Sequence, residues 1–346
     1  MGARSCAVFA AQDKLELVHE HETFMRRALD LARRGRFSVS PNPMVGCVIV
    51  RDGEVLAEGW HHRAGEPHAE IEALSRCEDA RDATMYVSLE PCSHHGRTPP
   101  CTDAITKAGI ARVVFAARDP LHGGAAKLPN VEVIAGVLED EARQINEKFL
   151  HAAPSRRPFV LLKAAMTLDG KLATVTRESQ WITGDAARQM SLALREEYDA
   201  VLVGGGTVAT DNPHLTRRLG WSATSWTRVV LDRGRVVPRD AHVLTDGAPT
   251  LHITEDADID HLLGDLYTRG IQSLIVEGGS LVLSEFIRRN LWQKMVIFVA
   301  PMMVGGAAAP SLFAGDGVAR LTEAYRFRFD RIEAVGSDLM ITAYPS

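Results

Sequence analysis

The segment from His68 to Cys101 constrains this chain most, because it holds three side chains that suit a single metal ion. It contains His-Ala-Glu at 68–70, Pro-Cys at 91–92 and a second cysteine at 101. One imidazole and two thiolates form a ligand set for a borderline-soft metal, and zinc is the first candidate. Three protein ligands leave one tetrahedral position for water, as in catalytic zinc sites. Glu70, two residues after His68, then becomes the candidate proton carrier for that water.

A structural zinc site is the alternative for the same cysteines. Cys92 and Cys101 flank a loop rich in proline and glycine, where packing gives no reason for cysteine. His94 or His95 would supply the fourth ligand of a closed site. Glu70 argues against that alternative, because a structural site needs no carboxylate beside its histidine.

The composition predicts a globular cytoplasmic protein of two domains. The chain has 346 residues, of which 46% are hydrophobic and 24% charged. The chain has only five cysteines, a small and odd number that does not suit a disulfide framework. Three of them are interpreted as small buried apolar residues: Cys6, Cys47 and Cys77. A net charge of −5 argues against non-specific nucleic-acid binding. No apolar run approaches the ~18–20 residues of a membrane span, so no membrane association is expected.

The first half alternates helix and strand patterns around the candidate metal ligands. Residues 21–34 have helical apolar spacing, and residues 45–61 form two apolar runs around Asp52-Gly53, a strong hairpin signal. Further helices are predicted from His68 and from Cys101, and strands at 84–90 and 112–120. This order predicts an α/β layer sandwich with the ligands at helix starts and at a strand end.

Domain boundaries follow from the segment 151–158, which contains two prolines and several basic residues. A short strand and a helix over 129–150 precede it. We therefore expect an extension of unknown use at 1–20, one domain at 21–150 and another at 158–346.

The second half also alternates strands and helices, from a strand at 159–166 to another at 294–301. A strand over 199–208 contains Gly-Gly-Gly, and Gly278-Gly279 opens a helix. Neither matches the dinucleotide fingerprint G-x-G-x-x-G. Glycines at a helix start can still seat a phosphate on free backbone amides, although a tight turn explains them equally well.

Three motifs in order resemble the bifunctional deaminase-reductases of riboflavin biosynthesis: PNPMVGCVIV, HAE and LEPCSHHGRTPPC. The H-x-E and P-C elements are those of zinc deaminases, but the cysteines are spaced C-x8-C instead of C-x-x-C. The resemblance implies a cytidine-deaminase-like α/β/α sandwich with zinc on His68, Cys92 and Cys101, and with Glu70 as proton shuttle. It places Asn42 and the loop 93–100 in the substrate pocket.

Two features lie outside that pattern. His61 and His62 are interpreted as ordinary residues at the end of the hairpin. The stretch after Pro120 is shorter than in the family, so the helix expected there is trimmed or missing.

The motifs LKAAMTLDGKLAT, ESQWITG, GGGTVATDNPHLTRR and VEGGSLVLSEF resemble the reductase half of the same family. The resemblance implies a dihydrofolate-reductase-like α/β domain that uses NADPH. Its cofactor contacts would be Ala165, Trp181, Thr207, Asp211, Gly279, Ser280, Leu281, Val282, Leu283, Ser284 and Glu285. Its substrate contacts would be Lys163, Ser179, Arg195, Leu215, Arg218 and Glu277.

Two of these residues make direct physical sense. Arg195 and Arg218 are expected to clamp a phosphate, because guanidinium groups match phosphate oxygens. Lys163 is expected to orient or polarise the substrate, without a proton-transfer role.

The sequence therefore predicts a bifunctional enzyme. The resemblance implies zinc-dependent deamination of a phosphoribosylamino-pyrimidine, followed by NADPH reduction of the ribosyl to the ribityl chain. The reductase resemblance also implies a homo-oligomer, a dimer or tetramer. The alternatives are a nucleic-acid or nucleoside deaminase with a fused ligand-binding domain, and a structural zinc module.

Overall fold

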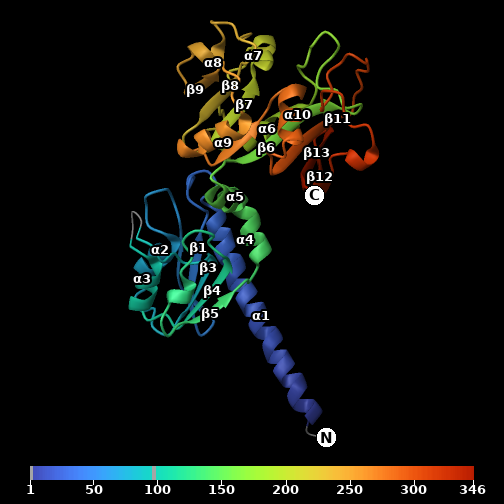
Figure 1. The fold of residues 1–346 in the computed structure, drawn as a ribbon. Helices are drawn as coiled ribbons and strands as arrows, with labels where there is room; N and C mark the ends of the chain where they lie inside the picture. Colours follow the sequence, from blue (N-terminus) through green and yellow to red (C-terminus); the bar gives the residue numbers. More distant parts are fainter. Residues whose placement is uncertain (1–2, 96–98) are drawn as a thin grey trace. The chain divides into compact units, whose positions relative to one another are not determined.

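The chain divides into two compact units, Met1–Ser155 and Arg156–Ser346, which are described separately (Figure 1). The computed structural model describes residues 3–95 and 99–346, with side chains from residue 18 onward. Along these residues no helix combines the length and the apolar character that crossing a membrane requires. The predicted architecture of two α/β domains is confirmed.

Unit 1 is built on a five-stranded sheet of order β2-β1-β3-β4-β5. Its strands are β1 (Gly46–Arg51), β2 (Glu54–Trp60), β3 (Thr84–Leu89), β4 (Arg112–Ala117) and β5 (Glu132–Ala135). β1 pairs antiparallel with β2 and β3, whereas β3, β4 and β5 are parallel. Asp52 and Gly53 turn the predicted hairpin with φ of 55° and 78°, a conformation that glycine adopts without steric cost.

Helices cover both faces of this sheet. They are α1 (Ala3–Arg33), α2 (Ala69–Ser75), α3 (Cys101–Lys107), α4 (Glu139–Ile145) and α5 (Glu147–Ser155). Successive strand residues point to opposite faces, so Ile49 packs in the cluster that contains α2 and α3 residues. Its neighbour Val48 packs in the cluster of α1 and α4. The result is the expected α/β/α sandwich, with α2 and α3 on the face that carries the candidate ligands (Figure 1).

Unit 1 differs from the sequence expectations at both ends. α1 begins at Ala3, so residues 3–20 of the expected extension belong to the same helix as the one predicted from residue 21. The helix predicted within 129–150 is divided at Asn146, whose buried amide exchanges two 2.8 Å hydrogen bonds with the backbone of Met44. The predicted boundary is 151–158, and its first five residues, 151–155, are still helical, within α5. After Pro120 only the 3-10 turn η1 (Ala125–Lys127) precedes β5.

The cysteines outside the ligand set behave differently from one another. Cys47 is buried and Cys77 is half-buried, each as a free thiol. The side chain of Cys6 lies outside the described part of the chain.

Unit 2 has an eight-stranded sheet of order β12-β13-β11-β6-β10-β7-β8-β9. The strands are β6 (Phe159–Thr167), β7 (Ala200–Gly204), β8 (Thr227–Leu231), β9 (Thr250–Ile253), β10 (Ser273–Val276), β11 (Lys294–Ala300), β12 (Phe327–Val335) and β13 (Asp338–Pro345). From β11 to β9 the strands are parallel, while β13 and β12 add an antiparallel edge.

The helices of unit 2 again cover both sheet faces. They are α6 (Asp185–Glu196), α7 (Gly205–Asp211), α8 (His242–Thr245), α9 (Ile259–Thr268) and α10 (Ser280–Arg288), with a 3-10 turn η2 (Leu321–Glu323). Residues of α9 and α10 form one core cluster with alternate strand residues such as Leu162. Residues of α6, α7 and α8 form the other, with strand residues such as Leu161.

Two elements of unit 2 correct the sequence analysis. The strand expected over 199–208 ends at Gly204, and α7 begins at Gly205. A Cβ at position 205 would lie 2.4 Å from Asp232 Oδ1, so only glycine lets the helix start there. The hairpin β12–β13 was absent from the expected element order. Its signal is present in the alternating residues around Gly336-Ser337, because a Gly-Ser pair is typical of two-residue hairpin turns.

Candidate functional site

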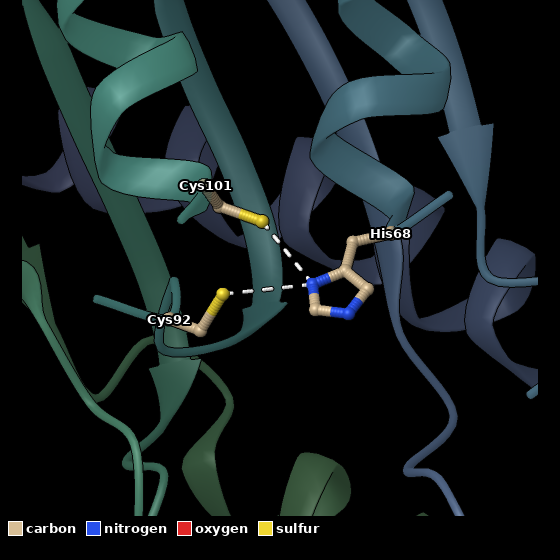
Figure 2. A group of neighbouring side chains, drawn as sticks. All are labelled: His68, Cys92 and Cys101. Atoms are coloured by element: carbon tan, nitrogen blue, oxygen red, sulfur yellow. Dashed lines mark hydrogen bonds between the residues drawn. The ribbon is translucent and has the colours of Figure 1, made fainter. Parts of the chain in front are cut away.

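The candidate metal ligands converge from three elements of unit 1 (Figure 2). His68 immediately precedes α2, Cys92 follows β3, and Cys101 is the first residue of α3. His68 Nδ1 lies 3.2 Å from Cys101 Sγ and 3.6 Å from Cys92 Sγ. A tetrahedral zinc with its usual bond lengths holds nitrogen and sulfur ligand atoms about 3.6 Å apart. The three donors therefore fit one zinc ion.

The surroundings favour negative charge on one of the two sulfurs, because the hydrogen bond with Cys92, together with burial, raises the pKa of the Cys101 thiol. A hydrogen bond with Cys101, together with the nearby His68 imidazole, lowers the pKa of the Cys92 thiol well below its usual value. A thiolate is the form that binds metal. Among the residues described, the metal-ligating group contains His68, Cys92 and Cys101 alone. His94 instead stacks on His122, with ring centroids 3.7 Å apart, so the structural alternative gains no fourth ligand from it.

Glu70 lies beside the three donors, in the first turn of α2. Its side chain is buried, with 3% exposure, and burial raises the pKa of its carboxyl above the usual value. The nearby His68 acts in the opposite direction. A carboxylate with a raised pKa accepts a proton more readily than an ordinary one, as a group that transfers protons in catalysis requires.

Asn42 is held by a histidine that the sequence pattern does not single out. His61 is buried; its Nδ1 lies 2.9 Å from Pro67 O and its Nε2 2.9 Å from Asn42 Nδ2. A carbonyl oxygen only accepts, so Nδ1 donates and Nε2 accepts from the Asn42 amide. The His61 ring also meets His68 edge-on at 5.7 Å. His61 is thus more than an ordinary residue at the end of the hairpin, whereas His62 stacks on Trp60. Of the predicted loop 93–100, residues 96–98 lie outside the described residues.

Unit 2 contains a cavity of about 1100 Å³ at the carboxyl ends of its parallel strands. Open α/β sheets bind ligands at this edge. Most of the predicted contacts line it: Lys163, Ala165, Ser179, Trp181, Arg195, Thr207, Asp211, Leu215, Arg218, Glu277, Gly279, Ser280, Leu281, Val282 and Glu285. Leu283 and Ser284 do not, because the helical period of α10 directs them into the core, where they are 1% and 0% exposed.

Two glycines precede α10 at the wall of the cavity. A Cβ at position 278 would lie 2.7 Å from Val282 Cβ, whereas a Cβ at Gly279 would have only Thr207 Oγ1 nearby, at 3.8 Å, so the backbone at Gly279 is open to a ligand. Ser179 Oγ donates to Asp211 Oδ1 at 3.2 Å, and burial raises the pKa of Asp211. Trp181 is 67% exposed at the cavity. These groups form a mixed polar and aromatic lining.

Arg195 is not a free cation in this cavity. Its Nε and Nη2 bind the two oxygens of Glu277 at 2.7 and 3.0 Å, and Lys163 Nζ lies 3.5 Å from the same carboxylate. Burial alone would raise the pKa of Glu277, but the charges of Arg195 and Lys163 outweigh it and lower the pKa to about 2. The expected phosphate clamp of Arg195 and Arg218 is therefore altered, because the charge of Arg195 is already compensated.

Comparison with known proteins identifies relatives of both units. Residues 18–117 match the model of the cytidine and deoxycytidylate deaminase zinc-binding region, and residues 158–341 match that of the RibD C-terminal domain. The riboflavin biosynthesis protein RibD of Aquifex aeolicus (strain VF5) is 41% identical over 349 residues, covering 92% of this chain and 97% of that protein. RibD of Escherichia coli (strain K12) is 37% identical, covering 93% and 98%.

A solved structure agrees with these matches. The diaminohydroxyphosphoribosylaminopyrimidine deaminase/5-amino-6-(5-phosphoribosylamino)uracil reductase of Thermotoga maritima superposes with a TM-score of 0.87 at 38% identity. The alignment covers 95% of this chain and 99% of that one.

Proposed function

Because the chain belongs to the RibD family of bifunctional deaminase-reductases in riboflavin biosynthesis, we propose a reaction for each of its units. Unit 1 hydrolyses an amino group of 2,5-diamino-6-(5-phosphoribosylamino)pyrimidin-4-one, forming a ring carbonyl and ammonia. Unit 2 then uses NADPH to reduce the ribosyl group of that product to ribityl. The convergence of His68, Cys92 and Cys101 beside the buried Glu70 carries the first assignment.

In the deaminase, His68, Cys92 and Cys101 hold zinc. Zinc in such a site lowers the pKa of a bound water to about 7. Glu70 accepts the proton of the attacking water and passes it to the leaving ammonia, a role that its raised pKa supports. Asn42 donates to His61 through its Nδ2, which leaves Oδ1 to accept a hydrogen bond from the pyrimidine.

NADPH bound in the cavity of unit 2 would supply the hydride for C1′ of the ring-opened ribosylamino group, with the balancing proton coming from solvent. The segment from Gly279 to Val282 and Glu285 contacts the cofactor together with Ala165, Trp181, Thr207 and Asp211, all of which line the cavity. The side chains of Leu283 and Ser284 pack in the core on the buried side of that segment and make no contact with the cofactor.

The substrate contacts of the reductase divide into those that orient the sugar and those that bind the phosphate or line the wall. Glu277 and Lys163 orient the sugar, while Arg195 holds Glu277 ionised. Arg218 is exposed at the cavity and is the cation for the substrate phosphate. Ser179 and Leu215 complete the substrate wall.

A homo-oligomer is part of the same proposal. Three apolar side chains on the antiparallel edge of the sheet are open to solvent: Phe329 is 63% exposed, Ile332 57% and Leu339 44%. An edge strand with exposed apolar residues is prone to pairing with another chain. A second copy of this chain is the occupant we assign. The sparse cysteines favour a cytoplasmic location.

A pair of glutamine variants tests the deaminase assignment. Zinc-loaded protein should release ammonia from the pyrimidine and then oxidise NADPH. Glu70→Gln should keep its zinc but lose about 10²–10⁴-fold in ammonia release, the usual contribution of general acid–base catalysis. Its NADPH oxidation should persist when the deaminated pyrimidine is supplied. Glu72→Gln, on the same helix, should match the wild type. Normal ammonia release by Glu70→Gln would exclude the proton-shuttle role.

A further inference from the structure

The loop 212–218 lies between α7 and β8 and is irregular along its whole length. Five of its residues line the large cavity of unit 2: Asn212, Pro213, His214, Leu215 and Arg218. Asn212 and Leu215 adopt positive φ values of 40° and 53°, which cost a non-glycine residue about 1 kcal/mol or more. Leu215 is nevertheless buried, with 3% exposure. Contacts from outside the loop must therefore hold this backbone in place.

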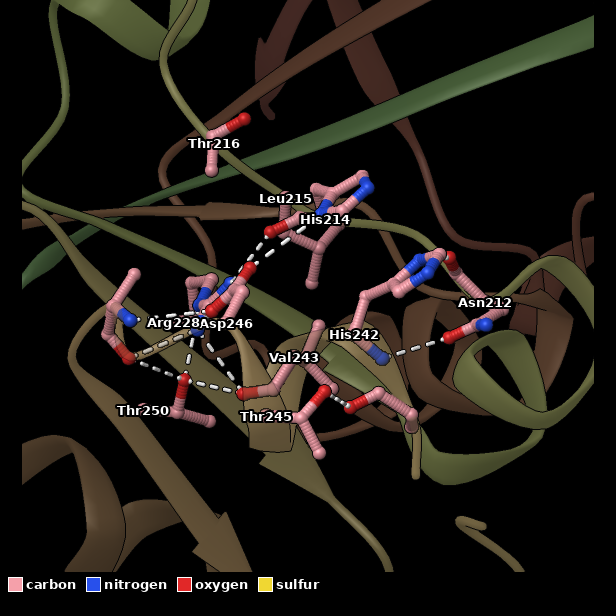
Figure 3. Close-up of polar contacts among 12 residues, drawn as sticks. Asn212, His214, Leu215, Thr216, Arg228, His242, Val243, Thr245, Asp246 and Thr250 are labelled. Atoms are coloured by element: carbon pink, nitrogen blue, oxygen red, sulfur yellow. Dashed lines mark hydrogen bonds and ion pairs between the residues drawn. The ribbon is translucent and has the colours of Figure 1, made fainter. Parts of the chain in front are cut away.

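The main external contact is the guanidinium of Arg228, on β8 (Figure 3). Arg228 is 1% exposed and donates from Nη1 to His214 O at 2.8 Å. The same group binds both oxygens of Asp246, each at 2.7 Å, and this pairing holds the pKa of Asp246 well below its usual value. Its remaining bonds reach α8 and the start of β9, at Val243 O, Ala248 O and Thr250 Oγ1. The buried Arg228 thus links the loop 212–218 to α8 and to the start of β9.

His242, the first residue of α8, closes the beginning of the loop (Figure 3). Its backbone N–H donates to Asn212 Oδ1, and its Nδ1 donates to Asn212 O, both at 2.9 Å. The rings of His242 and His214 stack with centroids 4.1 Å apart and planes 5° from parallel. The Arg228–Asp246 ion pair holds α8, which contacts Asn212, and Arg228 also holds the His214 carbonyl. The backbone from Asn212 to His214 is therefore held at both ends by groups that depend on this ion pair.

The later part of the loop is held from the other side. Trp226 Nε1 donates to Leu215 O at 2.8 Å, and Arg195 Nη1 donates to Thr216 O at 3.3 Å. Arg218 differs from these residues: its side chain is exposed at the cavity and is without an ion-pair partner in the part of the chain that the structure describes. The fixed loop therefore presents one available cation.

We infer that Arg228 and Asp246 form a clasp that positions the loop 212–218, and through it Leu215 and Arg218, for the phosphorylated substrate of the reductase. The inference rests on the proposed function. It makes Arg228 a positioning residue, because Arg228 contacts the loop carbonyl one residue before Leu215 and does not itself line the cavity. The carboxylate of Asp246 keeps the guanidinium oriented toward that carbonyl.

The test compares phosphorylated and dephosphorylated forms of the deaminated pyrimidine in the full-length enzyme. Arg228→Met should raise KM for the phosphorylated form about ten- to a hundredfold, the scale expected for a binding group displaced by about 1 Å. With the dephosphorylated form the increase in KM should be much smaller, because Arg218 then has no phosphate to bind and only the contact of Leu215 is displaced. KM for NADPH should stay within twofold. Arg228→Lys, which keeps the charge opposite Asp246, should recover part of the loss.

A matched control separates positioning from general destabilisation. Leu263→Ala removes a buried side chain of α9 in the same unit and should lower the melting temperature without changing either KM. An unchanged KM for the phosphorylated form in Arg228→Met, or an equal loss with both forms, would overturn the clasp.

Hydrogen exchange tests the clasp even if the wild type reduces neither pyrimidine, an outcome that would refute the proposed function alone. In Arg228→Met, amide exchange over residues 212–218 should accelerate at least tenfold relative to β7. Equal exchange in the two proteins would overturn the inference independently of activity.

Discussion

Replacing Glu277 by glutamine tests the charge balance of the reductase cavity. The carboxylate lies between Arg195 and Lys163, and the three side chains are only 10%, 12% and 14% exposed in that order. Glutamine keeps the shape and much of the hydrogen bonding but removes the negative charge. Two cations then remain in a buried site without their counter-ion, which is costly because water no longer solvates them.

The size of the effect follows from the pKa of Glu277. That pKa falls from an ordinary 4.5 to about 2, and each tenfold change in the equilibrium corresponds to about 1.4 kcal/mol, so the ionised carboxylate contributes about 3 kcal/mol. The same figure falls in the range of about 3–5 kcal/mol for breaking a buried ion pair. Because the folded-state pKa is depressed, this stability is fully present above pH 4.5 and is lost as the pH falls toward 2.

Urea unfolding followed by tryptophan fluorescence measures this contribution in the full-length chain. Four of the five tryptophans lie in unit 2, so a Trp60→Phe background makes the signal specific to that unit. At pH 7, Glu277→Gln should lower the free energy of unfolding by about 3 kcal/mol, and the difference should shrink by pH 3. Glu285→Gln, which loses a more exposed pair with Arg233, should cost less than about 1 kcal/mol. A loss below about 1 kcal/mol for Glu277→Gln, or the same difference at both pH values, would refute the reasoning.

Three further perturbations probe the zinc site, the cavity wall and the sheet edge. Chelation of zinc, or Cys101→Ser, should abolish ammonia release while NADPH binding measured by fluorescence stays unchanged; retained zinc in Cys101→Ser would contradict the ligand assignment. Gly205→Ala should destabilise unit 2 by about 1–3 kcal/mol in urea through overpacking, whereas Gly206→Ala, with open space around its Cβ, should not; equal effects would argue against crowding. Phe329→Asp should lower the mass measured by light scattering to that of a monomer, and an unchanged mass would move the interface elsewhere.

The clustering of the three candidate zinc ligands, His68, Cys92 and Cys101, could be predicted from the sequence because each belongs to a short local motif. His68 and Glu70 lie on one helical turn, and each cysteine lies at the end of an element that the apolar pattern already indicates. The order and spacing of these residues along the chain therefore predict that their side chains lie together. The hairpin β12–β13 was equally accessible, since its alternation and its Gly-Ser turn are explicit in the sequence.

Other features depend on partners far away along the chain. Asn146 interrupts a continuous helical pattern because its amide pairs with Met44, 102 residues earlier. Leu283 and Ser284 belong to a motif that the sequence analysis predicts to contact the cofactor, yet the helical period turns their side chains into the core. Sequence pattern locates such a segment but does not assign each side chain to the ligand side or the buried side.

The arginines of unit 2 show why charges counted from a sequence do not define a phosphate site. Arg217 and Arg218 are adjacent in the sequence, and Arg195 precedes them on α6. Arg195 neutralises Glu277, and Arg217 donates to the carbonyls of Arg195, Tyr198 and Thr224. The N–H donors of Arg195 and Arg217 bind backbone carbonyls and a carboxylate. These two arginines therefore stabilise the protein around the cavity and are not available to a ligand. Arg218 alone of the three remains available to a ligand in the described structure. Under the proposed function, affinity for the substrate phosphate depends on where the loop 212–218 places Arg218, and Arg228, which does not line the cavity, holds that loop through His214 O.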